Sequence, residues 1–265
     1  MTQIMPCGLS FIMTSSQTSH IERATLAAVS PQTVEELPGW LLPFDTSTVG
    51  RAISAVPLNH VFDDDAARLV SMIEARYVAH GLQAAFRLPD VASFEPLRQH
   101  LAHVGYHLEQ PTLVQVGTAA AMRKMAMQAL AAIDDAPDAA WAALFLGEGF
   151  DPVDGAHRVR HLSRAAGTVF ASVREGGELG LETIAAGAGA FSHGWASVHG
   201  MRTAQHQRGK GLAGRVLASL AQVALDRGFD KVFLQVEEAN TSAVALYRRA
   251  GFATAWRYGY WRKAG

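Results

Sequence analysis

The sequence predicts an α/β chain in which helices flank a β-sheet, and three observations support this prediction. Apolar residues recur at helical spacing over residues 212–224, directly after a glycine-rich turn, and again over residues 94–104. Residues 231–236 (Lys-Val-Phe-Leu-Gln-Val) are β-branched and apolar, which is typical of a buried strand. Alternating aromatic residues over residues 256–261 predict a final strand.

Composition limits the class of protein. The chain has 265 residues, which is enough for one large domain or two small ones. Its residues are 49% hydrophobic and 18% charged, which predicts a sizeable core and argues against disorder. A net charge of −1 gives no overall field that favours nucleic acid or an acidic membrane as a partner. We expect a globular monomer or homodimer.

Redox and targeting signals indicate the cytoplasm. The single cysteine, Cys7, excludes an internal disulfide framework and indicates a reducing compartment. No Lys or Arg precedes the mildly apolar residues 4–13, so they make a poor signal peptide. No apolar run reaches the ~18 residues needed to span a bilayer. We expect residues 1–19 to form a loose tail.

In the first part of the chain, helical and strand patterns alternate. Carboxylates satisfy the free N–H groups at a helix start, so the aspartates at residues 63–65 predict a capped helix that ends near His80. The predicted elements, in order, are a helix over residues 21–37, strands over 39–44 and 50–57 joined by a polar hairpin, the capped helix, a strand over 84–88, a helix over 94–104 and a strand after Gly105-Tyr106.

The second part of the chain repeats this alternation. The glycine-alanine run at residues 185–192 favours a flexible turn, and residues 195–203 are expected to form the central strand. The other elements, in order, are a strand over residues 113–116, a helix over 119–133, helices over 138–146 and 157–166 with a loop over 151–155 between them, a hairpin of strands 169–174 and 179–186, a helix from 212, the strand 231–236, a short helix over 242–250 and the final strand.

Residues 208–214 (Arg-Gly-Lys-Gly-Leu-Ala-Gly) combine glycines and two cations at the start of a predicted helix. The first N–H groups of a helix lack internal partners and carry partial positive charge. Glycine lets the backbone approach a bulky anion, so this turn is suited to bind phosphate. It is not a Walker loop, since no Gly-Lys-Ser/Thr follows at the required spacing. It is not a Rossmann loop, since no acidic residue ends a strand about 20 residues later.

Two signatures in this region resemble those of the GCN5-related N-acetyltransferases. Residues 208–213 have the spacing Arg-x-x-Gly-x-Ala of the family's acetyl-CoA pyrophosphate loop. Residues 236–252 contain Val-x-x-x-Asn and then Leu-Tyr-x-x-x-Gly-Phe, like the family's second signature, in the family's order and spacing. For residues 111–265 the resemblance implies a mixed, mostly antiparallel and splayed central sheet flanked by helices.

The resemblance also implies a reaction, the transfer of an acetyl group from acetyl-CoA to a primary amine, with no metal. Direct transfer in a ternary complex is favoured over an acyl-enzyme, because Cys7 lies outside the catalytic half. The rival hypothesis is a non-catalytic acyl-CoA-binding sensor or interaction module, which needs no base. The acceptor stays open among small amines, amino acids, aminoglycosides, peptide N-termini and protein lysines.

Residues 1–110 resemble the amino-terminal region of two-part bacterial acetyltransferases, and we predict that they form a degenerate copy of the catalytic domain in residues 111–265. The pattern Leu-x-x-x-Leu-x-x-x-Gly-Tyr over residues 97–106 is built like Ala-x-x-x-Tyr-x-x-x-Gly-Phe over residues 243–252. Where a phosphate loop would lie, residues 59–65 hold three carboxylates and no glycine. We expect this half to be structural or to shape a substrate cleft.

The resemblance assigns the cosubstrate to two segments. Charge from Arg208 and Lys210 assists the backbone amides that bind the pyrophosphate, which are those of Gly209, Lys210, Gly211, Leu212, Ala213 and Gly214. Main-chain N–H groups near Met201 and Thr203, on the splayed central strand, polarise the thioester carbonyl. The alternative is that residues 208–214 are a solvated basic turn.

Tyr247 is the candidate general acid for the departing thiolate, because a phenol with a pKa of about 10 matches the basicity of a CoA thiolate. Its alternative role is packing in the core against Phe252. Asn240 either hydrogen-bonds the cosubstrate or caps the next helix.

The general base has two candidates. Some relatives have a glutamate on the central strand at the position of Ser197 here, so the resemblance does not assign a general base at this position. His199 lies two residues further on the same strand face and titrates near neutrality. Glu237 ends the following strand and is able to act through water. A base-free mechanism, in which water takes the proton, also stays open. The aromatic residues of the final strand either pack there or line an acceptor pocket: Trp256, Tyr258, Tyr260 and Trp261.

Overall fold

The computed structural model describes residues 13–127, 130–147, 151–177 and 180–264. The helices are α1 (Ser15–Val29), α2 (Ala66–Ala79), α3 (Glu95–His103), α4 (Ala119–Arg123), α5 (Ala139–Leu146), α6 (Pro152–Arg164), α7 (Leu212–Asp226) and α8 (Thr241–Arg249). The strands are β1 (Thr33–Leu37), β2 (Trp40–Phe44), β3 (Val56–Pro57), β4 (Phe86–Pro89), β5 (Tyr106–Thr118), β6 (Ala132–Asp134), β7 (Val169–Gly177), β8 (Gly180–Ser192), β9 (Trp195–Thr203), β10 (Lys231–Glu237) and β11 (Ala253–Lys263). No helix in the described ranges is long and apolar enough to cross a membrane.

Eight of these strands form one sheet in the order β4-β11-β5-β10-β9-β8-β7-β6. Strands β9 and β10 pair in parallel, and the other neighbours pair antiparallel. A smaller antiparallel sheet contains β1, β2 and β3. The mixed, mostly antiparallel sheet that the sequence predicts is thereby confirmed.

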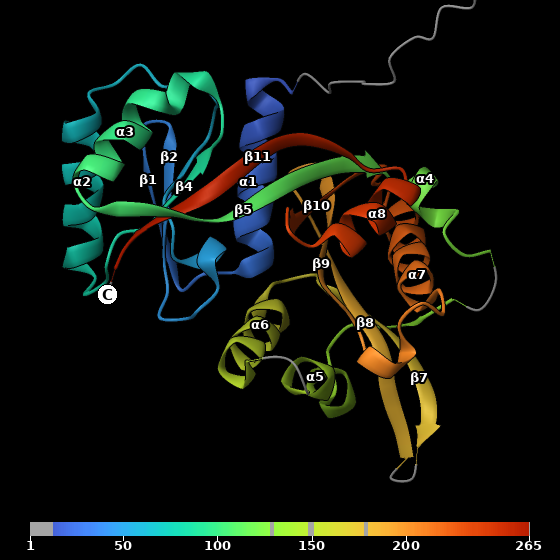
Figure 1. Ribbon diagram of the computed structural model, residues 1–265. Coiled ribbons are helices and arrows are strands. Elements are labelled where there is room, and N and C mark those ends of the chain that lie inside the picture. The colour runs from blue at the N-terminus through green and yellow to red at the C-terminus, as the bar shows by residue number, and fades with distance from the viewer. Residues whose placement is uncertain (1–12, 128–129, 148–150, 178–179, 265) are drawn as a thin grey trace, which may run out of the picture.

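Two long strands connect the parts of the molecule. In Figure 1, β5 and β11 run side by side from the helices α2 and α3 toward α7 and α8. The division of the chain after residue 110 falls inside β5, where Tyr258 lies opposite Thr112 and Tyr260 opposite Glu109, which makes a bulge in β5. Strand β11 also pairs with β4. Strands from both parts of the chain therefore share one sheet.

The strands β9 and β10 separate after a short parallel pairing. Their last paired residues are Val198 and Leu234, although β9 continues to Thr203 and β10 to Glu237. The expected splay of the central sheet is confirmed. N–H groups of β9 beyond Val198 are not paired with β10, so this part of the strand is available to a ligand.

A bulge in β9 accompanies the separation. Gly200 and Met201 both lie opposite Gly187 of β8, so β9 carries one extra residue. Gly200 takes a φ of +58°, a conformation that favours glycine. The bulge changes the direction of β9 at the point where the strands part.

The two faces of the sheet pack on different helices. Leu234 of β10 belongs to the apolar cluster around α7. Phe233 points to the other face and packs in the cluster that contains Ile21 of α1. Because side chains alternate along a strand, Gln235 and Glu237 share this second face. Gln235 and Glu237 therefore face α1 and not α7.

The prediction of a helix over residues 21–37 is wrong at both ends. Helix α1 begins at Ser15, so residues 15–19 are helical and not part of a loose tail, whereas residues 1–12 lie outside the described ranges. The helix ends at Ser30, which has a φ of +43° and precedes a proline. Residues 33–37 then form β1.

Two further predictions fail because of contacts with α7. The predicted helix over residues 119–133 ends at Arg123. Ser219 of α7 donates to the carbonyl of Ala131 at 3.0 Å, directly before residues 132–134 form the extended strand β6. Residues 185–192, expected as a turn, belong to β8. A Cβ at Gly187 would lie 2.8 Å from Val216 Cγ1, so glycine here allows close packing of helix on strand.

Two other differences are local. Residues 151–155, expected as a loop, start α6, because Asp151 caps the helix by accepting from the N–H groups of Val153 and Asp154 at 2.8 and 2.9 Å. Residues 50–57, expected as a strand, form the 3-10 turn η1 (Gly50–Ala52) and then the short strand β3. The turn of the β7–β8 hairpin includes residues 178–179, which lie outside the described ranges.

A buried ion pair fastens α1 to β4. Arg87 donates to Glu22 at 2.6 Å, and their side chains are 1% and 4% exposed. Burial raises the pKa of Glu22, although the charge of Arg87 acts in the opposite direction. The guanidinium of Arg87 also lies 5.1 Å from the centre of the Tyr258 ring. Each charge here depends on the other, because neither side chain reaches water.

We expect Glu22→Gln to lower the free energy of unfolding by about 3–5 kcal/mol, because Arg87 would stay buried without a counter-charge. Urea denaturation followed by circular dichroism measures this loss. Arg23→Gln, on the same helix as Glu22, breaks a more exposed pair with Glu36 of β1 and serves as the control, with a much smaller expected loss. Equal losses in the two variants would show that the buried pair contributes no more to stability than the exposed pair.

Candidate active site

A cleft of about 920 Å³ opens where β9 and β10 separate. It is lined by parts of α6, α7, α8, β9, β10 and β11 and by residues 48–51. The residues predicted from the sequence that line it are His199, Met201, Thr203, Arg208, Gly209, Gly211, Leu212, Ala213, Gly214, Glu237, Asn240 and Tyr247. Lys210 is not among the lining residues, because its Nζ turns to Gln207 and donates to Oε1 at 2.7 Å.

The N-terminus of α7 borders this cleft without a side-chain cap. Gly211 is the N-cap residue, with a φ of +77°, and Gly209 has a φ of +80°. A Cβ at either glycine would meet no atom within 4 Å, so the backbone here is open. The first N–H groups of α7 carry partial positive charge and point at open space, which suits a large anion.

Helix α2, in the first part of the chain, contrasts with α7. Asp65 accepts from the N–H of Arg68 at 2.8 Å and so caps the helix. Asp64 accepts from the N–H of Asp65 at 2.8 Å and pairs with the Arg68 side chain. The capping predicted from the aspartates is confirmed, and carboxylates occupy the position that an anion takes at an open helix.

Tyr247 belongs both to the core and to the cleft. Its ring packs edge-to-face on Phe252, with ring centres 6.1 Å apart, and the residue also lines the cleft. Burial raises the pKa of Tyr247 to about 12. The phenol therefore keeps its proton near neutral pH, as a proton donor must.

His199 is buried on the central strand. Its Nε2 lies 2.8 Å from Ser197 Oγ, whereas Nδ1 is buried and has no hydrogen-bond partner among the residues that the structure describes. Burial, assisted by the charge of Arg51, lowers the pKa of His199 to about 3. The imidazole is neutral at physiological pH, and so weak a base is poorly matched to proton removal there.

Glu237 has the contrasting environment. It is exposed, ends β10 and lines the cleft. Its main-chain carbonyl accepts from the N–H of Asn240 at 2.9 Å, which fixes the turn between β10 and α8. A solvated carboxylate at the edge of the cleft is able to take a proton directly or through water.

Asn240 and the aromatic residues of the final strand make local contacts that bear on the roles left open by the sequence. The Oδ1 of Asn240 accepts from the N–H of Ala243 at 3.2 Å, so the side chain caps α8. Tyr258 and Tyr260 line the cleft. Trp256 and Trp261 pack in separate apolar clusters. The final strand thus contributes both to the core and to the site.

The first part of the chain forms one wall of the cleft. Thr48 donates through Oγ1 to Asp154 Oδ1 at 2.9 Å and through its N–H to His157 Nδ1 at 3.0 Å, both on α6. One turn further along α6, His161 Nε2 lies 2.7 Å from Ser47 Oγ. These contacts hold residues 47–48 against α6.

Sequence reasoning missed this wall. Thr48, Arg51, Asp154 and Arg158 line the cleft. Thr48 and Arg51 lie in a loop and a 3-10 turn, and Asp154 and Arg158 lie in the first turns of α6, where no local motif marks them. Gln235 is different, because an amide inside the apolar run of β10 is a signal that the sequence does carry. Its Oε1 accepts from the Tyr258 hydroxyl at 2.8 Å.

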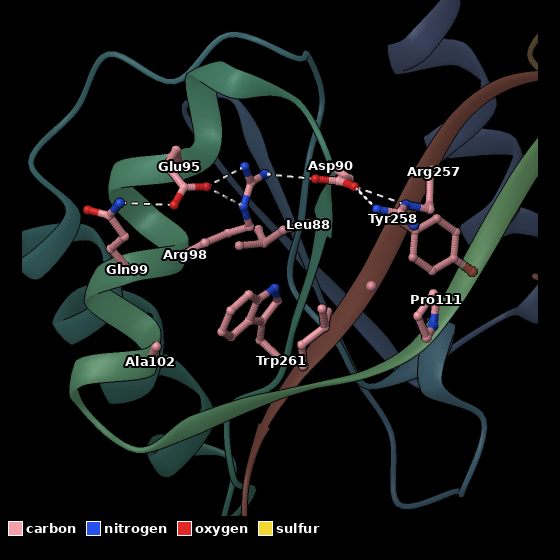
Figure 2. Close-up of a pocket in the computed structure, with 12 residues that line it drawn as sticks. Leu88, Asp90, Glu95, Arg98, Gln99, Ala102, Pro111, Arg257, Tyr258 and Trp261 are labelled. Atoms are coloured by element: carbon pink, nitrogen blue, oxygen red, sulfur yellow. Dashed lines mark hydrogen bonds and ion pairs between the residues drawn. The ribbon is translucent and has the colours of Figure 1, made fainter.

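A second, smaller cavity of about 320 Å³ lies between α3 and β11 (Figure 2). Its polar rim is paired internally. Arg98 bonds Glu95 at 2.7 Å and lies 3.8 Å from Asp90, which in turn pairs with Arg257. Tyr258 borders this cavity as well as the cleft. None of the predicted catalytic or cosubstrate-binding residues lines it, which favours the larger cleft as the candidate site.

Comparison with known proteins gives one family over nearly the whole chain. A family model described as "Probable histone acetyltransferase Rv0428c C-terminal" matches residues 15–261. A curated mycothiol acetyltransferase from Corynebacterium aurimucosum is 41% identical over 61 residues, which are 23% of this chain and 20% of that protein. The chain spans about a fifth of the length of the curated relatives it matches.

Solved structures show the same fold. A GCN5-related N-acetyltransferase from Kribbella flavida matches 98% of this chain and 97% of its own, with a TM-score of 0.68 and 17% identity. A tandem GNAT protein from the clavulanic acid biosynthesis pathway, described without AcCoA, matches 92% of this chain and 94% of its own, with a TM-score of 0.58 and 11% identity.

The low pKa of His199 predicts a pH dependence of stability. An unfolded histidine titrates near 6.5, whereas His199 in the folded chain titrates near 3. As the pH falls below about 6.5, the unfolded state binds a proton that the folded state excludes, so the free energy of unfolding decreases down to about pH 3. We expect His199→Gln to make this decrease shallower.

Urea denaturation at several pH values between 7 and 4 tests the prediction. His107→Gln, at an exposed histidine, is the matched control and should leave the decrease unchanged. A His199→Gln variant with the same pH dependence as the original chain would contradict the assignment.

Proposed function

The chain belongs to the GCN5-related N-acetyltransferases, in the family whose model matches residues 15–261, and on that premise we propose that it transfers the acetyl group of acetyl-CoA to a primary amine. Transfer is direct, in a ternary complex. The single thiol of the chain, Cys7, lies in residues 1–110, outside the proposed catalytic half.

The open N-terminus of α7 is the observation that carries this proposal. It combines two left-handed glycines, at which an added Cβ would meet no atom within 4 Å, with a helix end that has no side-chain cap. The cation of Arg208 lies beside them, at one end of a cleft of about 920 Å³. We assign the pyrophosphate to the amides of residues 209–214, with Arg208 adding charge. Lys210 supports the loop through Gln207.

The remaining residues supply the chemistry of transfer. Bound acetyl-CoA supplies an activated thioester, and we assign its carbonyl to main-chain N–H groups of Met201 and Thr203 on β9. The amine nitrogen bonds to the acetyl carbon, and its proton passes to Glu237 directly or through water. The C–S bond breaks, and Tyr247 gives its proton to the sulfur. We prefer Glu237 to His199 as the base, because His199 is buried and its pKa is about 3.

We also propose that residues 1–110 are a degenerate copy of residues 111–265. The order β1-β2-β3-α2-β4-α3-β5 matches the order β7-β8-β9-α7-β10-α8-β11. The name of the tandem GNAT protein, whose structure matches 92% of this chain, is consistent with such an arrangement. The carboxylates that cap α2 argue against a second acetyl-CoA site there.

The rival function is an acyl-CoA-binding sensor without catalysis. It would use the same α7 loop but would need neither Glu237 nor Tyr247 in the cleft. Both residues line the same cleft as the loop, and this favours the enzyme.

We expect acetyl-CoA to bind the full chain in isothermal titration calorimetry and Gly211→Glu to abolish binding. The variant adds a negative charge and a strained side chain at the proposed pyrophosphate site. Gly228→Glu is a matched control, because Gly228 also has a φ of +77° with no atom near its Cβ but lies at the other end of α7. Loss of binding in both variants would point to misfolding, and binding by Gly211→Glu would exclude this site.

We expect Tyr247→Phe to lower turnover by about 10²-fold with an amine found by screening, because the leaving thiolate loses its proton donor. Thiol release from acetyl-CoA measures turnover, and calorimetry checks that acetyl-CoA still binds. Undiminished turnover would rule out Tyr247 as the acid. Binding without turnover of any amine by the original chain would favour the sensor.

A further inference from the structure

Arg51 is a cation in the wall of the cleft that residues 1–110 contribute. It lies in η1 and lines the cleft together with Gln235 and Tyr258. Gln235 directly follows Leu234, the last residue of β10 that pairs with β9. Arg51 therefore faces the point where the two strands part.

The guanidinium of Arg51 has little to bind within the protein. Within the described part of the chain, its one hydrogen bond runs from a terminal nitrogen to Gln235 Oε1, at a long 3.4 Å. Among the described residues, no carboxylate lies within 4.0 Å of it. The acid whose charge acts on it, Glu22, is already bonded to Arg87 at 2.6 Å. A guanidinium has five N–H donors, so most of this capacity is left for a ligand.

The surroundings hold Arg51 in place. A Cβ at the preceding Gly50 would lie 2.9 Å from the Tyr260 ring, so the turn is pressed against β11. Gln235 is fixed from its other side, because its Nε2 donates to Thr25 Oγ1 at 2.9 Å. The neighbouring Thr48 is bonded to α6. A cation fixed in this way loses little conformational freedom when it binds an anion.

Because of its position, we assign Arg51 to binding of the acceptor and not of acetyl-CoA. The pyrophosphate site at α7 belongs to residues 209–214, and α7 packs on the opposite face of the sheet from Gln235. Gln235 and Glu237 share the α1 face by strand alternation. Arg51 and the proposed base thus border the same side of the reacting centre.

We propose that Arg51 binds the carboxylate of the acceptor, so that the acceptor is an α-amino acid or a closely related amino carboxylate. This inference rests on the proposed function. The amine of the amino acid forms the new C–N bond, the C–S bond of acetyl-CoA breaks, and the products are an N-acetyl amino acid and free CoA. Bidentate binding of a carboxylate is the geometry to which a guanidinium is best suited.

The test uses product complexes, so it does not require the right acceptor to be known. The full chain, saturated with CoA, is titrated with the N-acetyl derivatives of the twenty common amino acids and with the corresponding N-acetyl amides, which lack the carboxylate charge. We expect at least one acid to bind about tenfold or more tightly than its amide, since a hydrogen-bonded charge is worth about 1.5–3 kcal/mol. Arg51→Gln should abolish this preference, and Arg51→Lys should retain part of it.

Arg68→Gln, at an exposed arginine of α2, is the control for loss of charge and should keep the preference. Equal affinity for acids and amides, no binding of any acid, or an unchanged preference in Arg51→Gln would each overturn the proposal. A failure of CoA itself to bind is a separate result, because it contradicts the proposed transferase. The acids are then titrated without CoA, so the role of Arg51 is still decided.

Discussion

The early end of the pairing between β9 and β10 is the constraint on which the rest of the site depends. Beyond Val198 and Leu234 the strands diverge, and a bulge at Gly200 turns β9 away. A continuous ladder would use up the main-chain donors of β9, whereas the splay exposes them. The same divergence opens the cleft between two layers of helices. The groups that we propose for binding and for proton transfer therefore meet at one point of a single sheet.

The N-termini of α7 and α2 show how little separates the proposed phosphate site from a structural helix end. Helix α7 begins at a left-handed glycine without a side-chain cap, and helix α2 begins at Asp65, whose carboxylate fills the same position. The partial positive charge of the backbone is common to both helices. What differs is whether the chain supplies the anion itself or leaves that position to a ligand.

The two parts of the chain do not act as independent units. Strand β5 crosses from one to the other, and β11 returns to pair with β4. The buried pair of Glu22 with Arg87 locks α1 onto this junction. Through α1 and η1 the first part reaches the face of the sheet opposite α7, and there it supplies Thr48 and Arg51 to the cleft. The first part, which we propose to be a degenerate copy, thus borders the side of the cleft that we assign to the acceptor.

The sequence by itself determined the end of the cleft that we assign to the cosubstrate. Each of the segments 208–214 and 236–252 is continuous in the chain, and its glycines, helix starts and strand ends depend on local backbone chemistry, so the glycine-rich start of α7 and the turn from β10 into α8 follow from the residues. Tertiary structure decided the end of the cleft that we assign to the acceptor, and it also changed local elements. The helix that begins at Ala119 ends at Arg123, and residues 185–192 become a strand on which α7 packs. Arg51 and Thr48 join the cleft through contacts with residues more than 100 positions away, which no local pattern encodes. Burial is likewise a property of the folded chain. It makes His199 a weak base, whereas Glu237, the base that we propose, stays exposed.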